Sequence, residues 1–222
     1  NSPGANANAV AEIAMALMLA SMRRMIVADR YVRSGGWAKA EPTVLSTMPP
    51  GIAGRKIGIY GLGEIGRKIA ARCAAFDTEI GYFSRRRYDV PYTYFDNLDA
   101  LADWSDILFV AVRAGPDTVH KVDAALLKKL GPKGTIINIS RGSVIDQKAL
   151  VAALEAKIIA GAGLDVYEKE PHVPDALTHL ENVVLSPHIG GQTSEGLASM
   201  QDHAIRNLDA FFAGKPLPYP VE

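Results

Sequence analysis

Residues Lys56–Phe76 carry the feature that most restricts the fold of this chain. An apolar run of strand type, KIGIY, leads through the turn GLGEIG into the helical run RKIAARCAAF. Ile65, Ile69 and Cys73 recur at helical spacing, which predicts one buried stripe on that helix. Strand, tight turn and helix in this order predict the first unit of a parallel α/β sheet.

The same alternation continues towards the C-terminus. Runs of strand type are TEIGYF, DILFVAV, TIINIS, AGLDV and NVVLS, and helical runs between them are NLDALADW, VDAALLKKL and DQKALVAALEAK. Several strand-type runs are apolar throughout, as expected of strands that are covered on both faces. The predicted fold class is therefore α/β, with a Rossmann-type doubly wound parallel sheet.

Segments of different composition flank this alternation. Residues 7–32 have helical composition without proline, and the proline-punctuated segment after them reads as an arm or linker. Residues 193–212 form one more helical run. We therefore divide the chain into an N-terminal helix and arm, a central sheet domain and a C-terminal helix, with bounds 1–50, 51–190 and 191–222.

Composition excludes several classes of protein. Basic and acidic residues are equal at 24 each, so no overall field attracts nucleic acid or an anionic membrane. Cys73 is the only cysteine, which excludes a disulfide framework and fits the reducing cytoplasm, where we expect this protein. The apolar run at residues 9–22 contains Glu12 and is shorter than the roughly 20 residues of a membrane span, so we expect a buried helix.

The turn GLGEIG predicts a phosphate-binding loop because it joins a strand to a helix. Gly61 permits the tight turn, Gly63 lets a pyrophosphate approach the backbone, and Gly66 lets helix and strand pack closely. The helix N-terminus adds unpaired N–H groups and positive potential. A glycine-rich turn that binds no ligand is the alternative.

The second strand ends in SRRR, residues 84–87. In an NAD site, an acidic residue about 20 positions after the first glycine accepts hydrogen bonds from the adenosine ribose. This chain has Ser84, Arg85 and Arg86 there, and guanidinium groups suit a 2′-phosphate instead. We predict NADP(H) with these contacts and a solvated Arg87, while NAD(H) remains an alternative. A run of solvated surface cations is the other interpretation.

Three later segments should lie at the carboxyl ends of strands, where open α/β sheets bind ligands. NISRGSVID, GAGLDVYEKEP and LSPHIGG each place a chemically capable residue just after a strand: Arg141, Glu170 and His188. Each alone has an ordinary structural explanation, as a surface cation, a loop acid or a core histidine. Together, after a dinucleotide loop, they supply what hydride transfer to a carbonyl requires.

These motifs resemble those of the D-isomer-specific 2-hydroxyacid dehydrogenases. The matching elements are GLGEIG, NISRGSVID, AGAGLDVYEKEP and ENVVLSPHIGG, and the resemblance covers essentially the whole chain. Within the family, AFDTEIGYFSRRR, ALLKKLGPKGTIINISRG and EPHVPDALTHLENVVL most resemble the NADPH-preferring hydroxypyruvate/glyoxylate and hydroxyphenylpyruvate reductases. The resemblance implies reduction of a small 2-oxo acid to the D-2-hydroxy acid.

The resemblance also implies roles for the residues that match. His188 would be the general acid, Glu170 its hydrogen-bonded partner, and Arg141 the group that binds the 2-oxo acid and polarises its carbonyl. Asp165 would match the residue near the nicotinamide carboxamide, or be a structural acid at a strand end. Further expected cofactor contacts are Leu62, Glu64, Ile65, Val112, Thr118, Ile139, Gly190 and Gly191.

Two features depart from the family's pattern. Where members often have a proline–threonine pattern, this chain reads VRAGPDT, and Arg113 is an extra cation without an assigned role. Members also carry a first domain before the point where this chain starts. We expect a chain of this extent to keep cofactor affinity but lose most turnover, since closure of the active-site cleft needs one wall from each domain.

The remaining histidines have no metal-ligand spacing and are expected at the surface or on helices.

The resemblance implies a two-fold homodimer built on the N-terminal helix and arm. A different class of function is a dinucleotide-sensing, corepressor-like binding module, which can retain the same three residues. A formate dehydrogenase is disfavoured, because that branch has glutamine at the position of Glu170.

Overall fold

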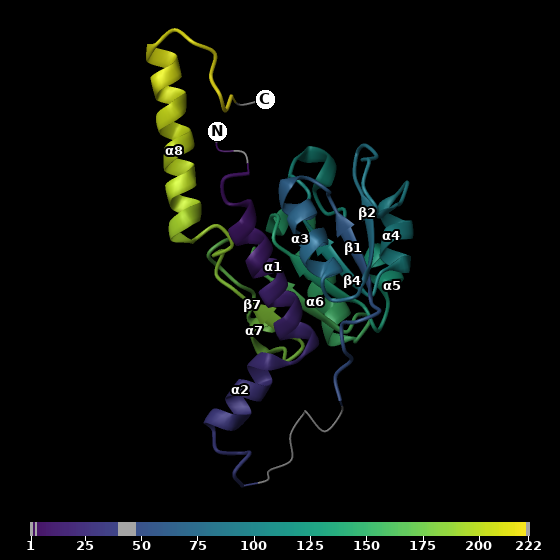
Figure 1. The fold of residues 1–222 in the computed structure, drawn as a ribbon. Helices are drawn as coiled ribbons and strands as arrows, with labels where there is room; N and C mark the ends of the chain where they lie inside the picture. The colour runs from purple at the N-terminus through teal and green to yellow at the C-terminus, as the bar shows by residue number, and fades with distance from the viewer. Residues whose placement is uncertain (1, 3, 40–47, 221–222) are drawn as a thin grey trace.

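A seven-stranded parallel sheet forms the centre of the molecule, whose computed structural model describes residues 2, 4–39 and 48–220 (Figure 1). Its strand order is β3-β2-β1-β4-β5-β6-β7, so the chain winds outwards in both directions from β1 and β4. The predicted fold class is confirmed. The strands are β1 (Lys56–Tyr60), β2 (Glu79–Phe83), β3 (Thr93–Tyr94), β4 (Ile107–Val110), β5 (Thr135–Asn138), β6 (Gly161–Leu164) and β7 (Val183–Leu185).

Helices cover both faces of the sheet, as the apolar strands require. On one face α1 packs against α3 and against the strands β5 to β7, and on the other α4, α5 and α6 pack side by side. Two apolar clusters, one on each face, make up the core. The helices are α1 (Ala7–Met22), α2 (Met25–Arg33), α3 (Glu64–Ala74), α4 (Leu98–Trp104), α5 (Ala124–Leu130), α6 (Gln147–Glu155), α7 (Asp175–His179) and α8 (Ser194–Phe212).

Local sequence explains where several helices begin. Four helices begin after a side chain that accepts a hydrogen bond from a backbone amide in their first turn. These side chains belong to Asn97, Asp123, Asp146 and Thr193. Side-chain oxygens at this position satisfy amides that have no partner within the helix. In α3 the predicted stripe is buried: Ile69 and Cys73 are fully buried, and Ile65 is partly buried.

The single helix expected over residues 7–32 is wrong, because the chain forms two helices there. α1 is largely buried against the sheet, whereas α2 contains no buried residue. Between them Arg24 has a left-handed backbone conformation, with φ of 51°. Met22 is buried, and the two arginines that follow it are exposed, since charged side chains are rarely buried without a partner. The buried helix therefore ends at Met22. Expected arm residues 40–47 lie outside the described residues.

Short elements were missed because their sequences carry too little periodicity. These are β3, α7 and the 3₁₀ turns η2 (Pro116–Thr118) and η3 (Gly142–Val144). At the C-terminus α8 was expected, and Figure 1 shows it (yellow) projecting away from the sheet. In the described part of the chain, no helix is both long and apolar enough to cross a membrane.

Candidate active site

The carboxyl edge of the sheet gathers the segments that the sequence singled out. Because all the strands are parallel, the ends of β1, β2, β4, β5, β6 and β7 meet at this one edge. It therefore carries the glycine turn, the SRRR segment and the three loops with Arg141, Glu170 and His188. Ligands of open α/β sheets bind at this edge.

The glycine turn has the geometry that a phosphate-binding loop requires. Gly61 has φ of 100°, and a Cβ there would lie 2.7 Å from the Cα of Val112. A Cβ on Gly66 would lie 2.1 Å from the carbonyl oxygen of Gly61. A Cβ on Gly63 would meet nothing within 4 Å, so space is open above the N-terminus of α3. The turn fits a ligand that approaches Gly63 closely.

Ser84 joins the end of β2 to this turn. Its hydroxyl oxygen accepts a hydrogen bond of 2.7 Å from the amide of Leu62, and the amide of Gly61 donates to the carbonyl of Phe83 at 2.9 Å. The Ser84 O–H hydrogen is then available to donate to a ligand. The three arginines that follow are exposed, and within the described residues none of them forms an ion pair.

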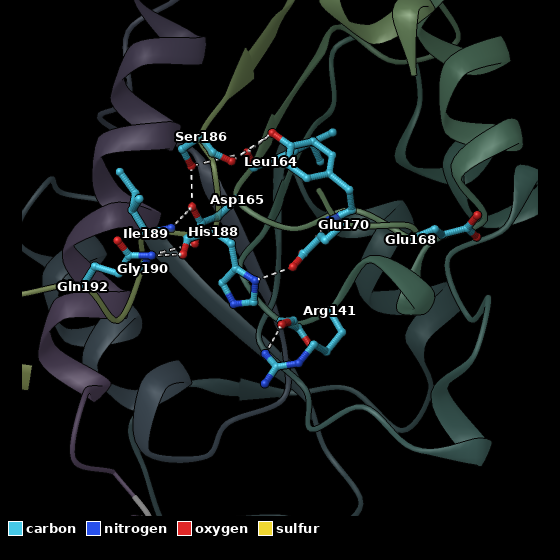
Figure 2. A network of polar contacts seen from close by, with 12 residues as sticks. Arg141, Leu164, Asp165, Glu168, Glu170, Ser186, His188, Ile189, Gly190 and Gln192 are labelled. Atoms are coloured by element: carbon cyan, nitrogen blue, oxygen red, sulfur yellow. Dashed lines mark hydrogen bonds and ion pairs between the residues drawn. The ribbon is translucent and has the colours of Figure 1, made fainter. Parts of the chain in front are cut away.

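His188 and Glu170 form the central polar pair of the site (Figure 2). The Nδ1 atom of His188 lies 2.7 Å from Oε2 of Glu170, whose other oxygen accepts from the amide of Tyr167 at 3.1 Å. Partial burial raises the pKa of Glu170, but the bonds from His188 and Tyr167 and the charge of Arg141 outweigh it and lower this pKa. An ionised Glu170 accepts, so Nδ1 of His188 carries the donated hydrogen.

Arg141 faces the same space from the loop after β5. Figure 2 shows its guanidinium group beneath the imidazole of His188. Its Nη1 donates to the carbonyl of Ser140 at 2.7 Å, and its own carbonyl accepts from the side chain of Asn138 at 3.1 Å. The guanidinium group is exposed and keeps donors free for an anionic ligand.

Asp165 anchors the loop that carries His188. It is 1% exposed, and its carboxylate accepts from the Ser186 hydroxyl at 2.6 Å and from the amides of Ile189 and Gly190 at 3.0 and 2.8 Å. His188 has φ of 55°, a left-handed conformation that these bonds hold. Of the two interpretations given to Asp165, the structure displays the structural one; a contact with nicotinamide stays a prediction.

The other expected cofactor residues border the same edge in different ways. Ile139 is buried, with 6% of its surface exposed. The carbonyl of Val112 accepts a hydrogen bond from the Ser140 hydroxyl. Arg113, the extra cation without an assigned role, is exposed. Thr118 binds within its own turn: its hydroxyl accepts from the Gly115 amide and donates to the Gly115 carbonyl, at 2.8 and 2.9 Å. Their contacts with a cofactor stay predictions, as do those of Glu64, Ile65 and Gly191.

Sequence reasoning missed a second histidine–glutamate pair, which His120 and Glu168 form. The two side chains meet at 2.6 Å, and Glu168 lies near the amide of Gln147 at 3.5 Å. The expectation that His120 is a surface residue holds, but it is not unpaired. No local pattern signals this pair, because its two residues are 48 positions apart in the sequence.

An apolar cavity of about 270 Å³ lies beside the catalytic candidates. Its lining combines Glu170 and His188 with apolar side chains, namely Tyr167, Pro171, Val173, Leu185 and Pro187, and with Ser186. Among the described residues, no group of three histidine, cysteine, aspartate or glutamate side chains is arranged to hold a metal ion.

Fold and site together define a dinucleotide-dependent oxidoreductase of the Rossmann type. The sequence model of one family, described as "D-isomer specific 2-hydroxyacid dehydrogenase, NAD binding domain", matches residues 15–190. The chain belongs to this family, as its motifs indicated.

Similar proteins carry more specific names. A hydroxyphenylpyruvate reductase of Plectranthus scutellarioides is 46% identical over 222 residues, which is 100% of this chain and 70% of that protein. A glyoxylate/hydroxypyruvate reductase of Arabidopsis thaliana is 45% identical with the same coverage. Among solved structures, an NADPH-dependent glyoxylate/hydroxypyruvate reductase of Sinorhizobium meliloti superposes with a TM-score of 0.91 at 40% identity, covering 100% of this chain and 69% of that one.

Proposed function

We propose that this chain binds NADPH and reduces a small 2-oxo acid, glyoxylate or hydroxypyruvate, to the D-2-hydroxy acid. The observation that carries the proposal is the 2.7 Å contact between His188 and Glu170 beside Arg141, on the sheet edge that also bears the glycine turn. Relatives named glyoxylate/hydroxypyruvate and hydroxyphenylpyruvate reductases support this choice of substrate class.

His188 is the proposed proton donor. Its Nδ1 is engaged by Glu170, so Nε2 is the nitrogen that faces the substrate; among the described residues Nε2 has no hydrogen-bond partner. As the carbonyl carbon is reduced, the proton on Nε2 passes to the carbonyl oxygen and becomes the hydroxyl proton of the product. Glu170 holds the ring in orientation and stabilises its protonated form.

Arg141 is the proposed anchor for the substrate. Its guanidinium group can bind the carboxylate of a 2-oxo acid and lie near the carbonyl oxygen, where negative charge develops. Its position beside His188 supports these two roles, since one substrate can then reach both groups.

The cofactor proposal depends on the glycine turn and on SRRR. NADPH supplies the hydride. The open space above Gly63 suits its pyrophosphate, and the Ser84 hydroxyl with Arg85 and Arg86 suits its 2′-phosphate. A similar solved structure is a complex with NADP and malonate, at 38% identity and a TM-score of 0.88.

Fluorescence titration with NADPH and, in parallel, with NADH tests the cofactor proposal. Two charge-assisted contacts to the 2′-phosphate should favour NADPH by about 3 kcal/mol, roughly a hundredfold. The control is Gly63→Ala, whose methyl group meets no protein atom but occupies the proposed pyrophosphate space. We expect it to fold normally and lose affinity for both cofactors. Equal affinities for NADPH and NADH would contradict the proposed cofactor preference.

Consumption of NADPH at 340 nm with glyoxylate or hydroxypyruvate tests the reaction, and chiral analysis of the product tests its D-configuration. Binding of NADPH with no turnover of any 2-oxo acid would favour either the corepressor-like binding module or the expected loss of turnover from a cleft with only one wall. A pull-down in the presence and absence of NADPH would then be the next measurement.

The proposed assembly is a homodimer through the N-terminal helix and arm. Large apolar side chains are exposed there, namely Met25, Ile26, Val32 and Trp37, and none of α2 is buried. Exposed apolar surface of this kind is typical of an interface. A homodimer in light scattering at micromolar concentration is the expected outcome, and a monomer would contradict it. The cytoplasm is the proposed location, which the single, buried Cys73 supports.

A further inference from the structure

Two arginines from different elements lie over the ring of Tyr88. The guanidinium carbon of Arg67 is 4.5 Å from the ring centroid, and that of Arg86 is 5.0 Å from it. Arg67 is in the first turn of α3, next to Gly66, whereas Arg86 follows the end of β2. The motifs of the chain had singled out Arg86 but not Arg67.

Neither cation is neutralised by the protein. Within the described residues, no carboxylate forms an ion pair with Arg67 or Arg86, and both side chains are exposed. A ring contact orients a guanidinium group without cancelling its charge. Two cations held at one ring repel each other, and an anion that binds both removes this repulsion.

Tyr88 is itself fixed to the core of the sheet. Its amide donates to the hydroxyl oxygen of Tyr82 at 2.8 Å, and its carbonyl accepts from that hydroxyl at 3.1 Å. Tyr82 lies on β2 and is fully buried. The ring that carries the two arginines therefore has a defined position relative to the end of β2.

That position borders the proposed adenosine site. Arg67 adjoins the glycine turn at Gly66, and Arg86 is two residues after Ser84, whose hydroxyl oxygen already accepts from the turn at Leu62. Arg67 thus comes from the helix that follows the turn, and Arg86 from the segment that follows Ser84.

We propose that Arg67 is a specificity-determining residue for the 2′-phosphate of NADPH, that it acts together with Arg86, and that Tyr88 is the positioning residue for both. The inference rests on the proposed function, because it concerns the cofactor of that same site. A 2′-phosphate carries two negative charges, and two guanidinium groups bind it through charge-assisted hydrogen bonds. NADH has only a hydroxyl at this position.

Titration of the whole chain with NADPH and NADH, in four variants, tests the inference. Arg67→Gln removes the cation and Tyr88→Leu removes the ring, whereas Tyr88→Phe keeps the ring. Lys68→Gln is the matched control, since it removes a cation from the next position of α3, which has no aromatic ring contact in the described part of the chain.

We expect Arg67→Gln and Tyr88→Leu to weaken NADPH binding about tenfold and leave NADH binding within about twofold. Tyr88→Phe and Lys68→Gln should behave like the unmodified chain. Because Arg67 is exposed, its replacement should not disturb folding. Arg67→Gln alone therefore carries the test if Tyr88→Leu does not fold.

A different pattern overturns the inference. If the unmodified chain prefers NADPH but Arg67→Gln leaves that preference unchanged, or weakens both cofactors equally, then Arg67 is not a selector and the proposed function stands. If the unmodified chain binds both cofactors equally, the inference and the proposed NADPH preference fail together.

Discussion

Two histidine–glutamate pairs lie on opposite sides of residues 167–170, and their local geometry is nearly the same. His188 meets Glu170 at 2.7 Å, and His120 meets Glu168 at 2.6 Å. Both histidines have left-handed backbones, with φ of 55° and 51°. The side chains of the histidines are 43% and 48% exposed. Distance, exposure and backbone conformation therefore do not distinguish the pair proposed for catalysis from the other one.

The surroundings of the two pairs differ. Opposite His188 stands the guanidinium group of Arg141, and an apolar cavity adjoins the ring. His120 instead lies between backbone segments: its amide donates to the carbonyl of Ser143, and Glu168 also faces the first amide of α6 at Gln147. We infer that the charge and space opposite a pair, and not its internal geometry, decide what it can do.

Replacing each histidine should give the largest difference between the pairs. We expect His188→Gln to lower turnover of NADPH with glyoxylate by about 10²–10⁴-fold, because glutamine cannot donate the proton. His120→Gln keeps a polar group at the surface and should lower turnover by less than about threefold. Initial rates at 340 nm measure both effects.

NADPH binding is the control for this comparison, and both variants should bind it as the unmodified chain does. Equal losses of turnover in the two variants would show that the pairs are not distinct in function.

The anchor of the His188 loop should give the next largest effect. Asp165→Ala leaves the partly buried amide of Ile189 and the buried amide of Gly190 without an acceptor, and we expect a loss of about 2–4 kcal/mol in the free energy of unfolding. Asp146→Ala is the matched control, because Asp146 also accepts from two amides but at the partly exposed start of α6.

Loss of a helix cap of the latter kind costs about 1 kcal/mol. Urea denaturation of both variants measures the difference. Similar losses would mean that Asp165 is no more than another cap, and that the loop of His188 is held by other contacts.

The two carboxylates should differ by less than the histidines do. Glu170→Gln keeps the shape of the pair but removes the charge, so we expect about a tenfold loss of turnover, whereas Glu168→Gln should change it less than about twofold. Initial rates at 340 nm measure both effects, and equal losses in the two variants would contradict the proposed role of Glu170 as the partner of His188.

The smallest expected effect is on how the free energy of unfolding depends on pH. The pKa of folded Glu170 lies below its unfolded value of about 4.3, so ionised Glu170 stabilises the fold above that pH. This contribution is lost as pH falls through the lower, folded pKa. Since Glu170 is 35% exposed, we expect it to be under about 1 kcal/mol.

Thermal unfolding of the unmodified chain and of Glu170→Gln, at a series of pH values from 7 downwards, measures the contribution of ionised Glu170 to stability. The two stabilities should differ at pH 7 and converge in acid. A difference that persists unchanged in acid would assign the stabilisation to packing and not to charge.

Much of the fold follows from local pattern. Apolar runs of strand length, amphipathic helices and capping side chains such as Asn97 and Asp123 are properties of short windows, and all of the expected strands form. The break at Arg24 was not foreseen, because it depends on where α1 leaves the sheet. Elements as short as β3 carry too few residues for a period to be recognised.

The site divides in the same way. Gly61, Arg141, Glu170 and His188 follow strands, and parallel strands end at one edge, so their proximity could be predicted from order alone. The contact of Arg67 with Tyr88 and that of His120 with Glu168 join residues 21 and 48 positions apart in the sequence. Neither has a local pattern that could have revealed it.

The sequence by itself therefore determined the class of fold, the glycine turn proposed to bind phosphate and the three residues proposed for catalysis, because each depends on chain order and short-range periodicity. Tertiary structure alone decided which glutamate pairs with which histidine, that Asp165 holds the loop of His188, and that two arginines share the ring of Tyr88. These depend on the directions of side chains from separate elements, and packing of the sheet and its helices sets those directions.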